Sequence, residues 1–280
     1  MLVAAILEIV ERSESKPVIV GLCGPQGCGK STLCELACDK LRRDGWNLDC
    51  VSLDDYYLPH ESLLALRDRL KNPLYEFRGN PGTHDVELLF EHLNAFKHGA
   101  HPIVVPTYDK HARGGLGDRN VSRGLGDRNA SRGLGDRTAP RVLGDRAASR
   151  TLGDRVTPRV ISLPLDILLV EGWMVGFQPC ESPETESATL LNESLRAYQK
   201  VWGLFSGYIF LRTRDLSIIY RWRWEQELNA CRLAGTHCRS KATIDRFVDQ
   251  FMPAYKLFYH VPPTNSIILE LDFDRKLTRL

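Results

Sequence analysis

The sequence predicts an α/β fold with a mostly parallel sheet and helices on both faces. Short, continuously apolar segments that are typical of buried strands alternate with longer segments of helical periodicity. A glycine-rich turn follows the first of these strands and precedes a helix. The chain has 280 residues and 43% hydrophobic content, which is enough for one large domain of this class.

The elements can be placed in order along the chain. Residues 17–22 are apolar and rich in β-branched side chains, which indicates a buried strand. Apolar residues then recur at helical spacing over 31–43, and Gly45 is expected to end that helix. We expect an exposed loop at 178–190, because it is rich in Glu, Ser, Thr and Pro. Further strands are expected at 48–53, 102–105, 163–171, 207–211 and 266–271, and further helices at 61–71, 86–98, 214–234 and 241–259, the last interrupted near Pro253.

One stretch does not fit this alternation. The tetrapeptide LGDR occurs five times between 116 and 155, with a period of nine residues. Each unit has a single apolar residue beside a glycine, so it buries too little surface to offset its ordering entropy. We therefore expect one domain, 1–280, carrying a repetitive, low-complexity insertion at 115–158 that forms a flexible loop.

Charge and cysteine content exclude several classes of protein. The net charge is +2, but residues 113–159 hold eleven Arg and five Asp, so the rest of the chain carries −4 and gives no argument for nucleic-acid binding. No apolar run approaches the roughly 20 residues of a membrane span, and the start lacks the features of a secretory signal. The eight cysteines include no C-x-x-C pair, so zinc spacing is absent. We expect a cytoplasmic protein with no membrane or nucleic-acid partner.

Residues 24–31, GPQGCGKS, match the phosphate-binding pattern G-x-x-x-x-G-K-[ST]. Glycines let successive backbone N–H groups point at one phosphate, and the helix that follows adds its positive end. Lys30 is expected to reach the β- and γ-phosphates, and the Ser31 hydroxyl to bind Mg²⁺. The motif predicts a P-loop fold that uses ATP and Mg²⁺. The predicted nucleotide-binding residues are Gly24, Pro25, Gln26, Gly27, Cys28, Gly29, Lys30, Ser31 and Thr32.

Carboxylates follow two of the predicted strands. Asp54 and Asp55 lie at the end of 48–53, and ligands of open α/β sheets bind beyond the carboxyl ends of strands. Two carboxylates there suit a base for a substrate hydroxyl and a partner for Mg²⁺. Glu171 ends the strand at 163–171, where a second metal-side carboxylate is expected. The alternatives are a capped turn for the aspartates and a solvated strand end for Glu171.

Polar residues in two loops suggest an acceptor site. His84 is expected to hydrogen-bond the substrate or to be structural, and Asp85 beside it is a candidate N-cap of the helix at 86–98. Tyr108, Asp109 and Lys110 follow the strand at 102–105 and suit a small polar or anionic substrate. The predicted acceptor-binding residues are Asp55, Tyr57, Thr83, His84, Tyr108, Asp109 and Lys110.

Arginines gather around the helix at 214–234. Arg212, Arg214, Arg221 and Arg223 are candidates to close over ATP and stabilise charge on the transferred phosphoryl group. The alternatives are a solvated basic helix face, or base stacking together with the neighbouring tryptophans.

Several segments resemble the D-glycerate 3-kinase family of plants, cyanobacteria and fungi, and they run in family order over nearly the whole chain. The segments are GPQGCGKST (24–32), SLDDYYL (52–58), RGNPGTHD (78–85), VPTYDKHARGGLGDR (105–119), PLDILLVEGWMVGF (164–177), WRWEQE (222–227) and FVDQFMPAYK (247–256). RGNPGTHD and EGWMVGF are the most specific. More distantly, the chain is similar to uridine kinase, phosphoribulokinase and pantothenate kinase.

The resemblance implies ATP-dependent phosphorylation of D-glycerate to 3-phospho-D-glycerate, by a P-loop kinase with a helical lid. It implies that Asp54 is the base and that Arg223 is a lid arginine. The predicted catalytic residues are thus Lys30, Asp54 and Arg223, and the predicted metal ligands are Ser31, Asp54 and Glu171.

The chain departs from the family pattern in two places. WRWEQE replaces a more usual WRLQAE-like stretch, and five LGDR copies stand where family members carry a single GDR. Residues 117–119 keep the spacing from YDK, whereas 153–155 keep the spacing to PLDILLVEG, so the sequence leaves open which copy does the family's work.

Two other functions remain open at this stage. One is a kinase of the same fold that phosphorylates another alcohol, such as a nucleoside or a pantothenate-like acceptor. The other is an ATP-binding regulatory protein whose Arg-rich insertion binds a polyanion. The sequence gives no indication of the oligomeric state.

Overall fold

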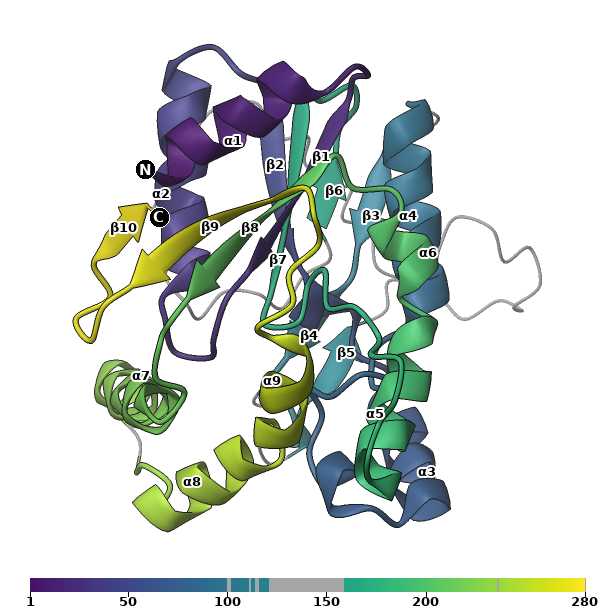
Figure 1. Ribbon diagram of the computed structural model, residues 1–280, viewed down its shortest axis with the longest axis vertical. Coiled ribbons are helices and arrows are strands. Elements are labelled where there is room, and N and C mark those ends of the chain that lie inside the picture. The colour runs from purple at the N-terminus through teal and green to yellow at the C-terminus, as the bar shows by residue number, and fades with distance from the viewer. Residues whose placement is uncertain (100–101, 111, 114–115, 121–158, 236, 280) are drawn as a thin grey trace, which may run out of the picture.

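A computed structural model describes residues 1–99, 102–110, 112–113, 116–120, 159–235 and 237–279. Its centre is a six-stranded sheet in the order β10-β9-β8-β1-β7-β2, in which every neighbouring pair is parallel except β9 and β10 (Figure 1). This confirms the predicted α/β class with a mostly parallel sheet. The strands are β1 Val18–Cys23, β2 Leu48–Ser52, β7 Ile167–Gly172, β8 Gly207–Arg212, β9 Ser266–Leu271 and β10 Leu277–Arg279.

Helices cover both faces of this sheet. The alternating residues of β1 belong to different cores: Val18 and Val20 pack with α1 and α2, whereas Ile19 and Cys23 pack with the helices of the opposite face. Burial on both faces explains why the central strands read as continuous apolar runs. The helices are α1 Leu2–Arg12, α2 Lys30–Arg43, α3 His60–Leu70, α4 Val86–His98, α5 Glu186–Arg196, α6 Gln199–Trp202, α7 Ile218–Ala234, α8 Lys241–Asp249 and α9 Met252–Phe258, with short 3-10 turns η1 Leu53–Tyr56 and η2 Pro73–Tyr75.

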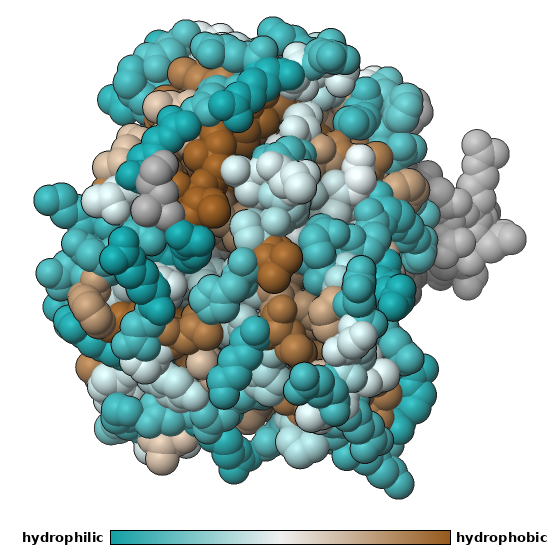
Figure 2. Space-filling view, in the orientation of Figure 1, coloured by the Kyte–Doolittle hydropathy of each residue, from teal (hydrophilic) through white to brown (hydrophobic). Residues whose placement is uncertain are grey.

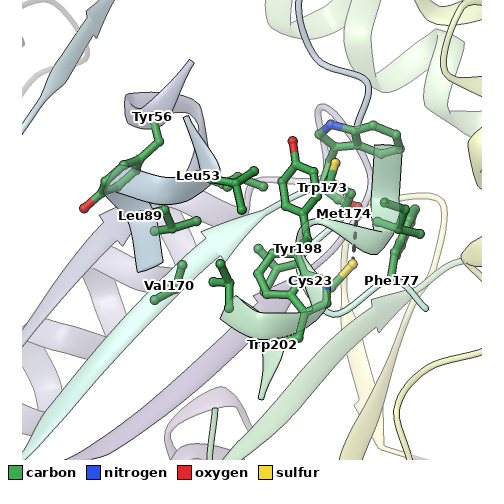
Figure 3. Packing of buried hydrophobic residues seen from close by; sticks show 14 of the residues in the cluster. Cys23, Leu53, Tyr56, Leu89, Val170, Trp173, Met174, Phe177, Tyr198 and Trp202 are labelled. Atoms are coloured by element: carbon green, nitrogen blue, oxygen red, sulfur yellow. Dashed lines mark hydrogen bonds between the residues drawn. The ribbon is translucent and has the colours of Figure 1, made fainter. Parts of the chain in front are cut away.

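Residues 173–177, which follow β7, lie in the larger of the two cores, the one that contains Ile19 and Cys23 (Figure 3). The Trp173 ring packs against the rings of Phe251 and Tyr255, at centroid distances of 5.1 and 5.0 Å, and the Cys23 thiol donates to the Trp173 carbonyl. The Trp173 indole N–H donates to the carbonyl of Gly79 at 2.9 Å. The EGWMVGF motif therefore packs the core and also anchors the 79–85 turn to the carboxyl edge of the sheet.

The predicted strand at 102–105 is not part of the central sheet, contrary to the expected alternation. Within the described residues, β3 Ile103–Val105 pairs with β6 Arg159–Ile161 and with no strand of the central sheet, and β4 Thr107–Asp109 pairs with β5 Asp118–Asn120. These two antiparallel ribbons lie beside the sheet, with β4 near its carboxyl edge (Figure 1). A strand of three residues gave no signal that could distinguish a ribbon from a sheet strand.

Several boundaries also differ from the prediction. The helix α1 was not predicted. It forms because Leu2, Ile6 and Ile9 lie on one face of the helix and pack in the same core as residues of β1 and α2. Helix α5 begins inside the expected loop at 178–190, because Thr185 accepts a hydrogen bond from Ala188 N and caps it. Helix α7 begins four residues later than predicted, after the Asp215–Ser217 turn.

Most of the predicted insertion at 115–158 lies outside the described residues, so its expected flexibility stays a prediction. None of the helices in the described part of the chain combines the length and the apolar character needed to cross a bilayer. In the orientation of Figure 1 the surface is mostly hydrophilic, and hydrophobic residues gather in a few gaps between elements, the largest below α1 (Figure 2).

Candidate active site

The predicted phosphate-binding loop connects β1 to α2 at the carboxyl edge of the sheet. Gly29 has φ +91° and caps α2, and Gly27 has φ +75°, so both occupy a left-handed conformation that favours glycine. The Lys30 ammonium lies within this loop and donates to the Pro25 carbonyl at 2.9 Å. Although burial lowers the pKa of Lys30, the neighbouring Cys28, Glu171 and Asp54 raise it above its usual value, so Lys30 is charged.

Three elements distant in sequence brace the loop. Gln26 N donates to the Tyr255 hydroxyl on α9 at 3.1 Å, and the Arg275 guanidinium donates to the Gly27 carbonyl at 2.9 Å. A Cβ atom on Gly27 would lie 2.6 Å from the backbone carbonyl of Trp222 on α7. The loop conformation is therefore fixed by α7, α9 and the β9–β10 turn as well as by its own sequence.

A hydroxyl and a carboxylate meet beside the loop. The Ser31 hydroxyl donates to Glu171 at 3.0 Å, and Glu171 is 5% exposed at the end of β7. No group of three or more His, Cys, Asp or Glu residues is placed to hold a metal within the described ranges. Mg²⁺ typically binds one or two protein carboxylates together with substrate phosphates and water, so the Ser31–Glu171 pair fits such an ion.

Asp54, on η1, has a hydrogen-bond partner on each of its carboxylate oxygens. One accepts from the Tyr57 hydroxyl at 3.0 Å and the other from the Lys110 ammonium at 2.7 Å. Burial raises the pKa of Asp54, but Lys110, His84 and Tyr57 outweigh this and hold it well below its ordinary value. Asp54 is thus ionised, and its partner Lys110 is 57% exposed.

His84 is placed next to Asp54 by backbone pairing. Leu58 N donates to the Thr83 carbonyl and Asp85 N to the Tyr56 carbonyl, which stacks the His84 ring on Tyr57 at a centroid distance of 4.4 Å. Burial lowers the pKa of His84 to about 4, so the imidazole is neutral near pH 7.

The tautomer of His84 follows from its partner Tyr198. The Tyr198 oxygen accepts a hydrogen bond from Gly82 N and lies 2.8 Å from His84 Nδ1. Among the described partners of the Tyr198 hydroxyl, Gly82 N can only donate, so we assign the phenolic proton to the bond with Nδ1, which leaves the His84 proton on Nε2. That Nε2 is buried and has no hydrogen-bond partner among the described residues. It is therefore a donor whose hydrogen-bonding capacity no described residue uses.

Cations face this site from two sides. The Arg78 guanidinium lies over the rings of Tyr108 and Tyr57, at 4.8 and 5.9 Å from their centroids. Arg223, on α7, stacks over Phe247, and burial together with the nearby Arg239 and Arg78 lowers its pKa although Glu227 opposes the shift. Of the other candidate arginines, Arg212 and Arg214 pair with Glu270, and Arg221 with Glu225.

The remaining predicted acceptor residues are placed differently. The Thr83 hydroxyl donates to Asn80 O and accepts from Gly79 N, so the turn itself uses it. Asp55 is buried and, after desolvation, is the main cause that raises the pKa of Tyr56. Asp109 lies at the end of β4, paired in register with Asp118. The structure thus brings Tyr57, His84, Tyr108 and Lys110 together around Asp54, and places Thr83 within a structural turn.

Sequence reasoning missed several residues that build the site. Arg78 and Tyr255 lie inside the motifs RGNPGTHD and FVDQFMPAYK, so the motifs contained a signal that we did not assign to these residues. Tyr198 and Arg275 lie in no motif, and their contacts span 114 and 248 residues. Only the fold could reveal them.

Comparison with known proteins found no matching family model. An uncharacterised kinase of Schizosaccharomyces pombe is 31% identical over 96% of this chain and 91% of its own length. The chloroplastic D-glycerate 3-kinase of Arabidopsis thaliana is 32% identical over 93% of this chain, which spans about half (53%) of the plant protein.

A solved structure shares the fold over almost the whole chain. It is the D-glycerate 3-kinase of Cryptococcus neoformans, which superposes with a TM-score of 0.78 at 24% identity and covers 99% of this chain and 96% of its own. The S. pombe protein is matched over nearly its full length. The similarity therefore covers the phosphate-binding loop as well as the segments around Asp54 and His84.

Proposed function

Since the chain belongs to the D-glycerate 3-kinase family of P-loop kinases, we propose that it transfers the γ-phosphoryl group of ATP to D-glycerate, giving 3-phospho-D-glycerate and ADP. The observation that carries this proposal is an ionised aspartate, Asp54, beside a charged P-loop lysine, Lys30, at the carboxyl edge of the sheet. A phosphate-binding loop and a carboxylate for the acceptor hydroxyl are the two parts that such a transfer needs.

On the nucleotide side, the loop amides and Lys30 hold the β- and γ-phosphates. Ser31 and Glu171, with Asp54 as a further candidate, would hold Mg²⁺, which would neutralise negative charge on the phosphates. Lys30 exchanges its bond to the Pro25 carbonyl for the phosphates. Arg223 acts from α7 as the lid arginine that stabilises charge on the transferred group.

On the acceptor side, the 3-hydroxyl of D-glycerate approaches Asp54 in place of Lys110. Asp54 orients that oxygen toward the γ-phosphorus and takes its proton as the new P–O bond forms and the bond to the β-phosphate breaks. Lys110 is the largest cause that holds the pKa of Asp54 below its ordinary value, so its displacement by the acceptor leaves an ionised carboxylate that accepts a proton more readily.

The charges around the acceptor position favour a small anion over a neutral nucleoside. Arg78 and Lys110 are cationic, and His84 Nε2 offers a neutral donor. A glycerate carboxylate can pair with Arg78 or Lys110 while His84 donates to an oxygen of the acceptor. We also propose that the protein is cytoplasmic and that it forms a single domain with an insertion at 115–158.

The test is a coupled assay of ADP release with Mg·ATP and five acceptors: D-glycerate, L-glycerate, uridine, pantothenate and ribulose 5-phosphate. We expect a stereoselective signal with D-glycerate, and a loss of at least about 100-fold in kcat/KM in Lys30→Ala. Activity on another acceptor alone would contradict the substrate and keep the mechanism. ATP binding without turnover on any acceptor would contradict the kinase proposal and support a binding role.

A further inference from the structure

The first copy of the nine-residue repeat, Leu116–Arg119, contacts the acceptor side of the site at every described position. The Leu116 carbonyl accepts from Arg78 at 2.7 Å, which holds that guanidinium over the Tyr108 ring. Gly117 has φ +82°, and a Cβ atom there would lie 2.5 Å from Tyr108. Only glycine fits this close approach to the ring.

Asp118 and Arg119 extend these contacts to two helices. Asp118 accepts from His60 N at the start of α3 at 3.0 Å and pairs with Arg113. Arg119 donates to Asp85 at 2.8 Å, and its side chain is only 8% exposed. The second Asp85 oxygen caps α4 through Leu88 N. Arg119 thus holds the residue that follows His84 in the chain.

We propose that this first copy is the one that completes the acceptor site, with Arg119 a positioning residue for His84 and Leu116 one for Arg78, and that the site does not require the other four copies. The identity of the acceptor rests on the proposed function above. The choice of copy rests only on these contacts.

The strand register supports the second half of the proposal. β5 ends with Asn120 opposite Thr107, and β6 begins with Arg159 opposite Val105, so Pro106 alone separates the two partner positions. β5 and β6 are thus two parts of one antiparallel partner of 103–109. The repeat interrupts that partner strand at a single point.

A chain with one copy can close this gap. Deletion of 120–155 removes four whole repeats and joins Arg119 to 156–158. These three residues would face Thr107 and Pro106, so one residue is in excess, which a β-bulge accommodates. Because the repeat is periodic, this deletion gives the same sequence as removal of 116–151, so it shows that one copy suffices and not which one works.

Point substitutions identify the copy. Arg119→Ala should raise the KM for the acceptor about tenfold, since a charged hydrogen bond is lost, while the KM for ATP stays within about twofold. Arg119→Lys should recover part of the acceptor affinity. The matched variant Arg155→Ala, at the same place in the fifth copy, should leave both KM values unchanged. Equal effects of the two alanine variants, or an effect of Arg155→Ala alone, would overturn the assignment.

The deletion variant should keep kcat and both KM values within about twofold of the full chain. A loss of turnover in a deletion variant that still melts cooperatively would show that the other copies are required.

A measurement without substrate separates this inference from the proposed function. We expect faster amide hydrogen exchange over 79–92 in Arg119→Ala and unchanged exchange in Arg155→Ala, since only the first removes the contact to Asp85. This outcome would support the choice of copy even if D-glycerate were not the acceptor. Unchanged exchange over 79–92 in Arg119→Ala would overturn it even if D-glycerate were phosphorylated.

Discussion

The two sides of the site are built in different ways. The phosphate-binding part of the nucleotide side is one stretch of nine consecutive residues, 24–32, that runs from the end of β1 into the first turn of α2. The acceptor side is assembled from η1, the turn at 79–85, β4 and the first repeat copy, which meet through the Asp54–Lys110 and Asp85–Arg119 pairs. A phosphate is recognised by local backbone geometry, whereas the acceptor is recognised by side chains that only the fold brings together.

This difference makes the two sides separable by mutation. Substitutions on the nucleotide side should affect ATP binding and the packing of α7, and those on the acceptor side should affect turnover or the acceptor KM alone.

The largest effect is expected for Asp54→Asn. The amide keeps the shape of the side chain but cannot take the proton of the acceptor hydroxyl, so kcat should fall about 10³-fold with the KM for ATP nearly unchanged. Steady-state kinetics in both substrates measure this, with Asp68→Asn on the exposed face of α3 as a neutral control. Full turnover in Asp54→Asn would remove the base assignment, and a parallel loss of ATP affinity would place Asp54 on the nucleotide side as a metal ligand.

Gly27→Ala tests the nucleotide side. The added methyl group would lie 2.6 Å from the Trp222 carbonyl and would also impose a positive φ on alanine. We expect a loss of stability of about 3 kcal/mol, from about 1–2 kcal/mol of backbone strain plus overpacking, together with weaker ATP binding. Chemical denaturation and titration of ATP measure the two effects.

Gly45→Ala is the matched control. Gly45 also has a positive φ, +93°, but no atom lies near its Cβ position, so this variant should show the strain alone and bind ATP normally. Equal stabilities of the two variants would show that the contact between α7 and the loop has no energetic role.

The sequence predicted almost completely where the structure places the residues assigned to the nucleotide side, and only in part where it places those assigned to the acceptor side. The P-loop could be predicted because its motif lies between an apolar run typical of a strand and a segment with helical periodicity. The ends of β2 and β7 could be predicted because a carboxylate directly follows or ends an apolar run there. Asp85 was correctly expected as an N-cap, since that role depends on its own helix. The roles of Tyr198, Arg78 and Arg119 depend on contacts with other elements, and the repeat offered five equivalent candidates for one position.

The pH dependence of stability should report on the acceptor side. The pKa of folded His84 is about 4, below its ordinary value of 6.5, so the unfolded chain binds more protons between these values. Stability should therefore fall as the pH decreases, by about 2 kcal/mol between pH 8 and pH 5. Asp54, whose pKa is lowered, contributes stability that is lost only below about pH 4.

Denaturation at several pH values measures this slope, and His84→Asn should reduce it. His92→Asn is the comparison, because burial lowers the pKa of His92 in the same direction without placing that ring beside Asp54. Since the pKa of Lys30 is raised, ATP binding should change little over the same range. A slope that is unchanged in His84→Asn, or that falls more in His92→Asn, would show that His84 does not carry the pH dependence.

The smallest effect is expected for Tyr198→Phe, which frees the tautomer of His84 and removes the acceptor of Gly82 N but changes no contact of the phosphate-binding loop. Without the phenolic proton, Nδ1 loses its donor, and the imidazole proton is free to occupy either nitrogen. His84 Nε2 is then protonated in only part of the molecules. The KM for the acceptor should therefore rise about three- to tenfold, while the KM for ATP is unchanged. The ¹⁵N shifts of His84 provide an independent readout, because they distinguish the two tautomers.

Tyr75→Phe, which removes a buried hydroxyl bound to Pro81 O on the same turn, is the control for loss of packing. If Tyr75→Phe raises the acceptor KM as much as Tyr198→Phe does, the effect comes from the turn and not from the His84 proton.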